Sequence, residues 1–217
     1  MGNLFNPENR LFQILNKIVG IMQLSLLWFL FSLPLVTVGA ATTALYYTTN
    51  KTLFKNRGYI WQEFWNSFKS NFKQSTIAWL VILFLCILAI VDFYILHALA
   101  VFTNNSNMDY IILALLLALV ICWASYLFPY IARFNNKTLL IMKNAFIMAI
   151  LNLLWTVLLL VPFVLAIIVL VAYPPLLFFV PGLYMSCLVL ILERIFCKYM
   201  SPEDLAIEKE RNQIYKD

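Results

Sequence analysis

A run of 33 residues without a charge, Ile18 to Asn50, constrains this chain more than any other feature of its sequence. One straight bilayer crossing needs only about 20 apolar residues. Pro34 lacks a backbone donor and clashes with the preceding turn, and Gly39 disfavours a helix interior. We therefore expect two short helices, over 8–33 and 38–55, that meet at a break near Pro34–Gly39. A re-entrant hairpin over 18–50 is the alternative.

Composition and the long apolar runs indicate a membrane protein. Apolar residues make up 64% of it and charged residues 12%, whereas a soluble domain is about half apolar and about a quarter charged. The alternating strand-length segments of a membrane barrel are missing. We expect an all-α, polytopic transmembrane helix bundle, with residues 1–200 as one transmembrane domain. Residues 201–217 are expected to form a short polar cytoplasmic helix, opened by the N-cap pattern Ser201-Pro202-Glu203-Asp204.

The positions of the basic residues favour six membrane helices. Beyond the first two, we expect helices over 73–102, 110–134, 138–172 and 177–199. With six helices all 15 Lys and Arg residues fall on one side, and basic residues accumulate in cytoplasmic loops. Both termini are then cytoplasmic. A single crossing at 18–50 would put the N-terminal basic residues outside, and a signal peptide cleaved near Val38-Gly39-Ala40 would put 51–73 outside.

A distinct amphipathic segment covers 59–72. Five aromatic side chains recur there at helical spacing, and Gln62, Glu63 and Lys69 are among the polar residues on the opposite face. This pattern predicts an interfacial helix on the cytoplasmic side, with an aromatic face in the headgroup region. The face is either a partner-docking surface or a plain surface anchor. Its residues are Trp61, Phe64, Trp65, Phe68 and Phe72.

Intramembrane polar residues supply a second candidate site. Asp92 lies inside a long apolar segment, where a carboxylate is expensive and marks a solute, ion or proton pathway by default. A structural hydrogen bond, or snorkelling to the outer surface, is the alternative. Thr42 and Thr43 lie in a segment of small residues that favours close helix packing, and Asn152 is suited to an interhelical hydrogen bond.

Glu193 and Arg194 form a second group of charges near an expected helix end. They could pair with Arg133 or Asn152 across the bundle, or snorkel to the interface.

Enzymatic chemistry has no sequence support. No metalloprotease motif, nucleophile elbow, phosphate-binding glycine loop or carboxylate cluster occurs. The four cysteines form no Cys-x-x-Cys pair and have no nearby histidine, which favours reduced, structural thiols. We therefore expect no catalytic residue, cofactor or metal site. The basic pI of about 9.0 reflects membrane sidedness and not nucleic-acid binding.

Three stretches resemble the YesL-like family of uncharacterised bacterial membrane proteins. They are Asn3-Leu4-Phe5-Asn6-Pro7-Glu8-Asn9-Arg10, the segment from Ser32-Leu33-Pro34 through Thr37-Val38-Gly39-Ala40-Ala41 to Tyr46-Tyr47, and the segment from Phe64 to Gln74. The resemblance implies a bacterial cytoplasmic membrane and a link to carbohydrate use. It implies no catalytic residues, because the family has none established.

Two functions remain from the sequence. In the first, the protein is a non-enzymatic accessory or assembly factor of an ABC-type carbohydrate-uptake system, with sugar-transporter subunits as its partners. In the second, it is a small autonomous transporter or channel with Asp92 in the pathway. The lipid bilayer is a partner in both, and self-association stays open.

Overall fold

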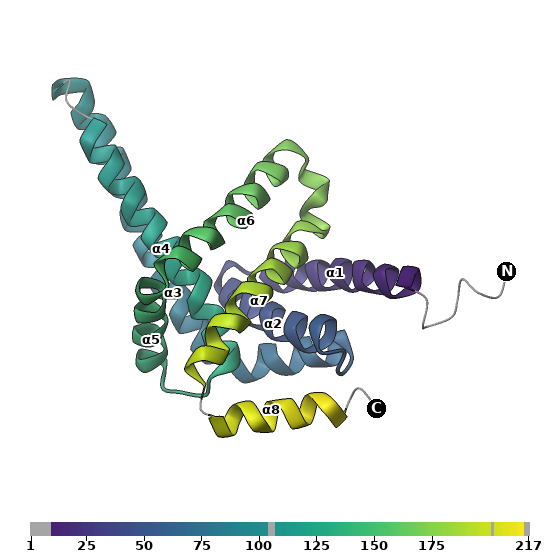
Figure 1. Ribbon diagram of the computed structural model, residues 1–217. Helices are drawn as coiled ribbons and strands as arrows, with labels where there is room; N and C mark the ends of the chain where they lie inside the picture. Colours follow the sequence, from purple (N-terminus) through teal and green to yellow (C-terminus); the bar gives the residue numbers. More distant parts are fainter. Residues whose placement is uncertain (1–9, 104–106, 201, 215–217) are drawn as a thin grey trace.

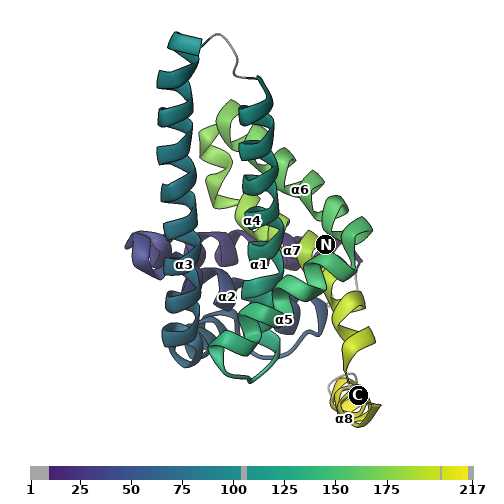
Figure 2. The same ribbon diagram turned by 90° about the vertical axis from the view of Figure 1, so that its left-hand side faces the viewer.

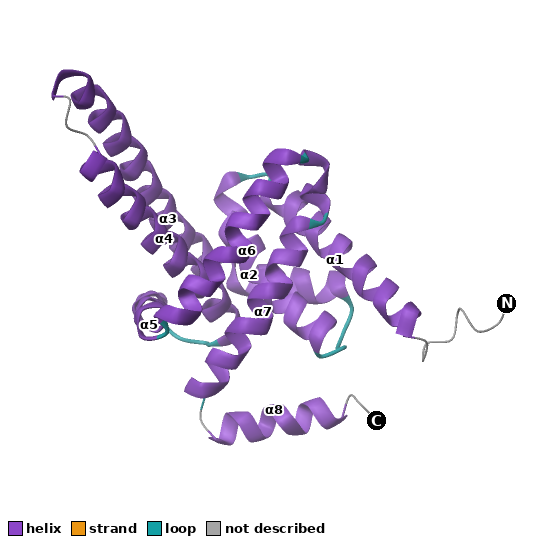
Figure 3. Ribbon diagram, turned by 45° about the horizontal axis from the view of Figure 1, so that its top comes forward, coloured by secondary structure: helices purple, strands orange, loops and turns teal. Residues whose placement is uncertain are grey.

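The computed structural model describes residues 10–103, 107–200 and 202–214, and in those ranges it contains helices and no strand. The all-α expectation is confirmed, as Figure 3 shows. The expected helix start at Asn6-Pro7-Glu8 lies outside the described residues. Two helical hairpins, α3–α4 and α6–α7, project from a common packed region and diverge from each other (Figure 1).

The predicted break after the first helix is present. Helix α1 (Arg10–Ser32) ends before Pro34, a single 3-10 turn η1 (Leu35–Thr37) follows, and α2 (Val38–Thr48) then begins. The Thr37 hydroxyl donates to the carbonyls of Phe31 at 2.6 Å and Pro34 at 2.7 Å. These bonds satisfy carbonyls that the helix end leaves open. Gly39 lies within α2 and not in the break.

Gly39 lets α2 approach α3 (Ile60–Thr103) closely. A β-carbon at Gly39 would lie 2.6 Å from the Ser75 carbonyl oxygen and 2.6 Å from the Trp79 β-carbon. Four residues on, the hydroxyls of Thr43 and Ser75 are 2.8 Å apart. This agrees with the expectation that small and hydroxyl residues bury the second helix, because Ala40, Ala41 and Ala44 are fully buried.

The predicted boundary between an interfacial helix at 59–72 and a membrane helix at 73–102 is wrong, because α3 runs unbroken through both. No proline or glycine occurs from Ile60 to Thr103 to interrupt it. After α2, a π-helical segment η2 (Thr49–Phe54) and a short connection lead into α3. In Figure 1 the first turns of α3 run beneath α2 before the helix continues into the projecting hairpin.

The prediction of a single helix over 138–172 is wrong, because the structure has two helices in this range. Helix α5 (Thr138–Leu151) ends at Asn152, and α6 (Leu153–Ala172) begins directly after it. The Asn152 side chain donates to the Met148 carbonyl at 3.0 Å, a local bond that competes with the helical ladder. The Thr156 hydroxyl donates to the Ala149 carbonyl at 2.7 Å across the break.

The remaining helices complete the bundle. Helix α4 (Asn107–Arg133) lies alongside the outer part of α3, as Figure 2 shows. A 3-10 segment η3 (Pro174–Phe178) joins α6 to α7 (Val180–Tyr199). The last helix, α8 (Pro202–Ile214), lies below the end of α7 in Figure 1. Helix α7 touches α1 closely, since the Gly182 amide donates to the Ser25 hydroxyl at 2.8 Å.

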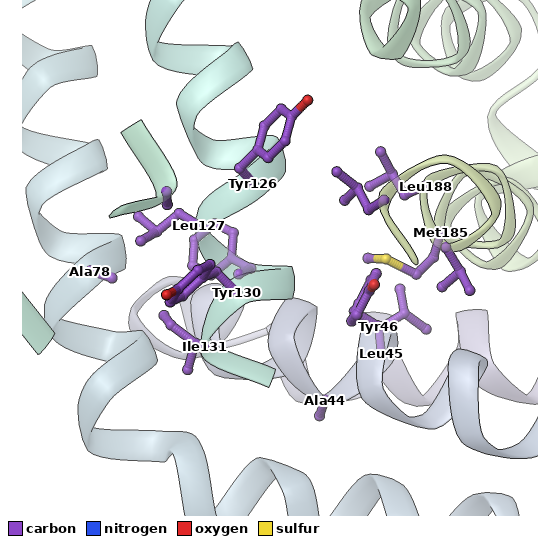
Figure 4. Packing of buried hydrophobic residues seen from close by; sticks show 14 of the residues in the cluster. Ala44, Leu45, Tyr46, Ala78, Tyr126, Leu127, Tyr130, Ile131, Met185 and Leu188 are labelled. Atoms are coloured by element: carbon purple, nitrogen blue, oxygen red, sulfur yellow. The ribbon is translucent and has the colours of Figure 1, made fainter. Parts of the chain in front are cut away.

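The buried core lies where α2 is enclosed, a region that we call the base. It consists of α2, η2, residues 60–82 of α3, 123–133 of α4, α5, and 185–199 of α7. Figure 4 shows Leu45 and Tyr46 of α2 beside Met185 of α7, and Leu127 of α4 on the side of Ala78 of α3. All five are buried. We call residues 83–103 and 107–122 of the α3–α4 hairpin the outer arm.

Five helices among the described residues are long and apolar enough to cross a membrane, so the predicted count of six is not confirmed. They are α1, α3, α4, α6 and α7. Helix α2 has 11 residues, which is about 16 Å at the α-helical rise, against a hydrocarbon core of about 30 Å. Helix α2 is too short to cross such a core alone, and it is buried among the other helices.

Candidate functional site

Asp92 lies in the outer arm, far from the base. Its side chain is exposed and borders a hollow of about 240 Å³ whose other walls are Asp109 and apolar side chains of α3 and α4. Ser75, the partner of Thr43, precedes Asp92 by 17 positions on the same helix. At the α-helical rise this is about 25 Å. The structure therefore does not bring Asp92 together with the threonines of α2.

Thr42 and Thr43 hold helices together. The Thr42 hydroxyl donates to the Val38 carbonyl at 2.7 Å and accepts from the Trp28 indole at 3.1 Å, which ties α1 to α2. The Thr43 hydroxyl lies 3.0 Å from the Gly39 carbonyl, in addition to its contact with Ser75. Both hydroxyls are thus engaged in helix packing.

Asn152 has a separate structural setting. Besides the bond to Met148, its amide donates to the Tyr199 hydroxyl of α7 at 3.1 Å. No hydrogen bond within the described ranges joins Asn152 to Asp92, Thr42 or Thr43. The four residues are therefore distributed over three parts of the bundle.

The aromatic face of 59–72 is partly covered by α1. Phe31 packs against it, with ring centroids 5.5 Å from Phe64, 5.5 Å from Trp65 and 5.0 Å from Phe68. Phe64 is fully buried, whereas Trp61 is 55% exposed and Phe72 is 40% exposed. The centre of the face is used inside the molecule, and its two ends remain accessible.

An apolar groove lies at the accessible Trp61 end of this face. It has a volume of about 550 Å³ and runs between α1, the start of α3 and η3. Gln23 is the one polar side chain on its wall. The lining residues are Val19, Met22, Gln23, Leu26, Leu27, Ile60, Trp61 and Phe178.

Charged residues gather in another part of the base, around Glu193 of α7. Its carboxylate accepts from the Tyr46 hydroxyl at 3.0 Å and from the Asn50 amide at 2.5 Å. Its second oxygen lies 3.3 Å from the Arg133 guanidinium and 3.9 Å from the Lys55 ammonium. Of the alternatives that the sequence leaves open for Glu193, the structure shows pairing with Arg133 and not snorkelling to the interface. Four elements, α2, η2 with its following residue, α4 and α7, thus meet at one carboxylate.

Glu208 of α8 completes this charge cluster. Its carboxylate forms ion pairs with both Lys55 and Arg133. Burial alone would raise the pKa of Glu208, but the hydrogen bonds from Arg133 and Lys55 outweigh it and lower that pKa below its usual value. Glu208 is therefore ionised at neutral pH and holds α8 to the base.

A further ion pair extends the cluster along η2. The Lys51 ammonium lies 2.7 Å from the Glu63 carboxylate and donates to the Tyr47 hydroxyl at 3.3 Å. Burial acts to lower the pKa of Lys51, but Glu63 and Tyr47 outweigh it and raise that pKa. Lys51 thus remains charged across the physiological range.

Two adjoining polar cavities open beside Arg133. One, of about 230 Å³, is lined by Tyr46, Tyr47, Asn50, Lys51, Lys55, Arg57, Ala132, Arg133 and Glu208. The other, of about 330 Å³, is lined mainly by amide and hydroxyl side chains of α3, among them Asn66, Ser67 and Asn71. Tyr47 and Arg133 border both. In the described part of the chain, no group of His, Cys, Asp and Glu side chains has an arrangement that could hold a metal ion.

The sequence pointed to Glu193 and Arg133 but not to Lys55, Asn50, Tyr46 or Glu208 as their partners. The signal in the sequence was weak. Asn50 ends the uncharged run, Lys55 follows it by five residues, and Glu208 is one of several charges in a polar tail. Only the three-dimensional positions of η2 and α8 bring these residues together.

Comparisons with known proteins find one family whose model resembles part of the chain. The model of a family described as "Protein of unknown function, DUF624" matches residues 21–93, about a third of the chain. That stretch runs from α1 through α2 into the outer part of α3. No curated protein and no solved structure matches. Over residues 21–93 the chain is similar to an uncharacterised family, a match consistent with the YesL-like resemblance.

Proposed function

We propose that this protein is a non-enzymatic accessory or assembly factor in a bacterial cytoplasmic membrane, and that it binds a transmembrane helix of a sugar-transporter subunit. The family resemblance suggests the class of partner. The observation that carries the docking proposal is the apolar groove of about 550 Å³ beside Trp61. Such a groove suits a helix whose apolar side chains enter it.

The arrangement of the polar residues supports this function over transport. The Asp92 hollow is lined mostly by apolar side chains on the outer arm, and the Thr42 and Thr43 hydroxyls hydrogen-bond within the helix packing. A solute pathway built from Asp92 and the threonines needs these groups to line one continuous polar cavity. The alternative function, a small transporter with Asp92 in its path, has no such cavity to support it in the described residues.

Both termini are proposed to lie on the cytoplasmic side, together with the base. Lys51, Lys55, Arg133 and Lys198 all belong to the base or to its edge, and basic residues favour the cytoplasm. The η2 segment after α2 returns the chain to the first half of α1, since a β-carbon at Gly20 would lie 2.7 Å from Leu53 and both segments line one pocket. The α1–α2 hairpin thus begins and ends on the same side of the membrane, whether or not it crosses the bilayer fully.

Crosslinking in native membranes, followed by affinity purification and mass spectrometry, tests the partner. We expect a sugar-transporter subunit to be recovered in proportion to the tagged protein. Leu26→Trp fills the groove and is expected to reduce that recovery about tenfold or more, whereas Leu30→Trp, one turn away on exposed α1 surface, leaves it unchanged. Recovery of no transporter subunit, or equal recovery with both variants, contradicts the proposal.

A further inference from the structure

The smaller polar cavity of the base, at about 230 Å³, has a strongly basic wall. Lys51, Lys55, Arg57 and Arg133 line it, and among the described residues on its wall Glu208 is the acidic one. Pockets for drug-sized ligands span roughly 300–1,000 Å³. This cavity therefore suits a small anion or a headgroup.

Glu208 is the only lining residue that comes from α8. It fills the position between the Lys55 ammonium and the Arg133 guanidinium with an anionic group. A carboxylate there makes the charge-assisted hydrogen bonds that a phosphate oxygen would make. The Nε atom of Arg133 is buried and has no hydrogen-bond partner in the structure, so one donor of the guanidinium is unused.

Among the described side chains of α8, Glu208 forms the ion pairs that hold the helix to the base. None of its described side chains is buried, and Figures 1 and 3 show α8 below the end of α7. A 13-residue polar helix is marginal in water by itself. Displacing Glu208 would therefore free one carboxylate position at the Lys55 ammonium and at the Arg133 guanidinium, which both also face Glu193.

We propose that this cavity binds the phosphate group of an anionic ligand, and that Glu208 occupies the site as an internal competitor which the ligand displaces together with α8. The phosphate comes either from a soluble phosphorylated solute or from a lipid headgroup, because both present the same oxygens to Lys55 and Arg133. This site is separate from the apolar groove, so it does not depend on the partner proposed above.

Binding of inorganic phosphate to the full chain in phosphatidylcholine nanodiscs, measured by calorimetry, tests the competition. Glu208→Gln removes the competing charge and is expected to strengthen phosphate binding about tenfold, which corresponds to about 1.4 kcal/mol, because phosphate then no longer displaces a charge-assisted pair. Glu210→Gln removes the same charge from an exposed position of α8 and should behave as wild type. Lys55→Gln added to Glu208→Gln should abolish the gain.

The source of the phosphate follows from a second measurement on the same nanodiscs. A nitroxide at Gln213, in a chain whose four cysteines are replaced, reports release of α8 as increased mobility. Release by inorganic phosphate in pure phosphatidylcholine supports a soluble ligand. Release only when phosphatidic acid is included supports a headgroup. Release by neither, together with equal phosphate binding by Glu208→Gln and Glu210→Gln in folded protein, overturns the proposal.

Discussion

The base and the outer arm are both built from apolar helices, yet they bury very different shares of their side chains. The fully buried Tyr46, Phe64 and Phe196 all belong to the base. In the outer arm, Leu113 is the only described residue that is buried. The base also holds the ion pairs around Glu193 and Glu208, whereas the outer arm carries isolated carboxylates at Asp92 and Asp109.

This difference separates what stabilises the fold from what contacts lipid. In a bilayer, apolar surface gains little by leaving lipid for another helix, so packing and hydrogen bonds stabilise the bundle. The base has both, through the Gly39 approach and the Thr43–Ser75 contact. The outer arm presents leucine and isoleucine outward, as a lipid-facing surface requires.

The largest effect is expected from two phenylalanines on α3 that differ in burial. Phe64→Ala in the base should destabilise the protein by about 3–5 kcal/mol, because it leaves a cavity beside Phe31. Phe84→Ala in the outer arm, where the ring is 60% exposed, should cost far less. Denaturant titration in detergent micelles compares the two. Equal losses would show that the outer arm is packed as tightly as the base.

The next effect concerns the close contact between α2 and α3. Gly39→Ala places a methyl group against the Ser75 carbonyl and is expected to destabilise by about 1–3 kcal/mol, since backbone has to move. Gly20→Ala meets only the end of the Leu53 side chain, which turns aside, so its midpoint should stay at or above that of wild type. Thermal unfolding of both variants provides the measurement, and a stable Gly39→Ala protein would refute the proposed tight contact.

Acidification is expected to release α8 from the base. The folded-state pKa of Glu208 is lowered by Arg133 and Lys55, so its ion pairs stabilise docking above the ordinary value of 4.5 and are lost as pH falls through the lower, folded-state pKa. Glu193 also faces Lys55 and Arg133 and stays with the base. Nitroxide mobility at Gln213 should rise below pH 4.5 and stay constant between pH 5 and 8. A transition near neutral pH would assign docking to another group.

The smallest effect is expected at Asp92. Its exposed carboxylate has no hydrogen bond or ion pair in the structure, so Asp92→Asn should leave both the unfolding midpoint and the recovery of a partner within error of wild type. Crosslinking yield and thermal unfolding check this. A folded Asp92→Asn protein that loses a solute flux would instead favour the transporter.

The sequence predicts the helical class and most membrane segments because long apolar runs have one stable solution in lipid. It also predicts the break at Pro34 and the burial of the small-residue helix, and it leaves the pairing of Glu193 with Arg133 open as one of several alternatives. The predicted helix boundary at residues 72–73 is wrong. The amphipathic pattern ends there, but no proline or glycine interrupts the helix. The split at Asn152 was missed because a single asparagine in an apolar run gives no strong stop signal.

The charge cluster was harder to foresee for a different reason. Lys55 precedes Glu193 and Glu208 by more than a hundred residues in the sequence. Each of the three could equally be a solvated residue near a helix end. Their meeting depends on α2 returning beside α1 and on α8 lying under the base. Such long-range placement leaves no trace in local periodicity.

Hydrogen exchange of α8 in nanodiscs, followed by mass spectrometry, tests most directly whether Glu208 pins this helix to the base. The amides of α8 should be equally protected from exchange in wild type and in Glu210→Gln. In Glu208→Gln the amides of α8 should lose that protection, while those of α2 and α7 keep theirs. Equal protection of α8 in all three proteins would contradict the account.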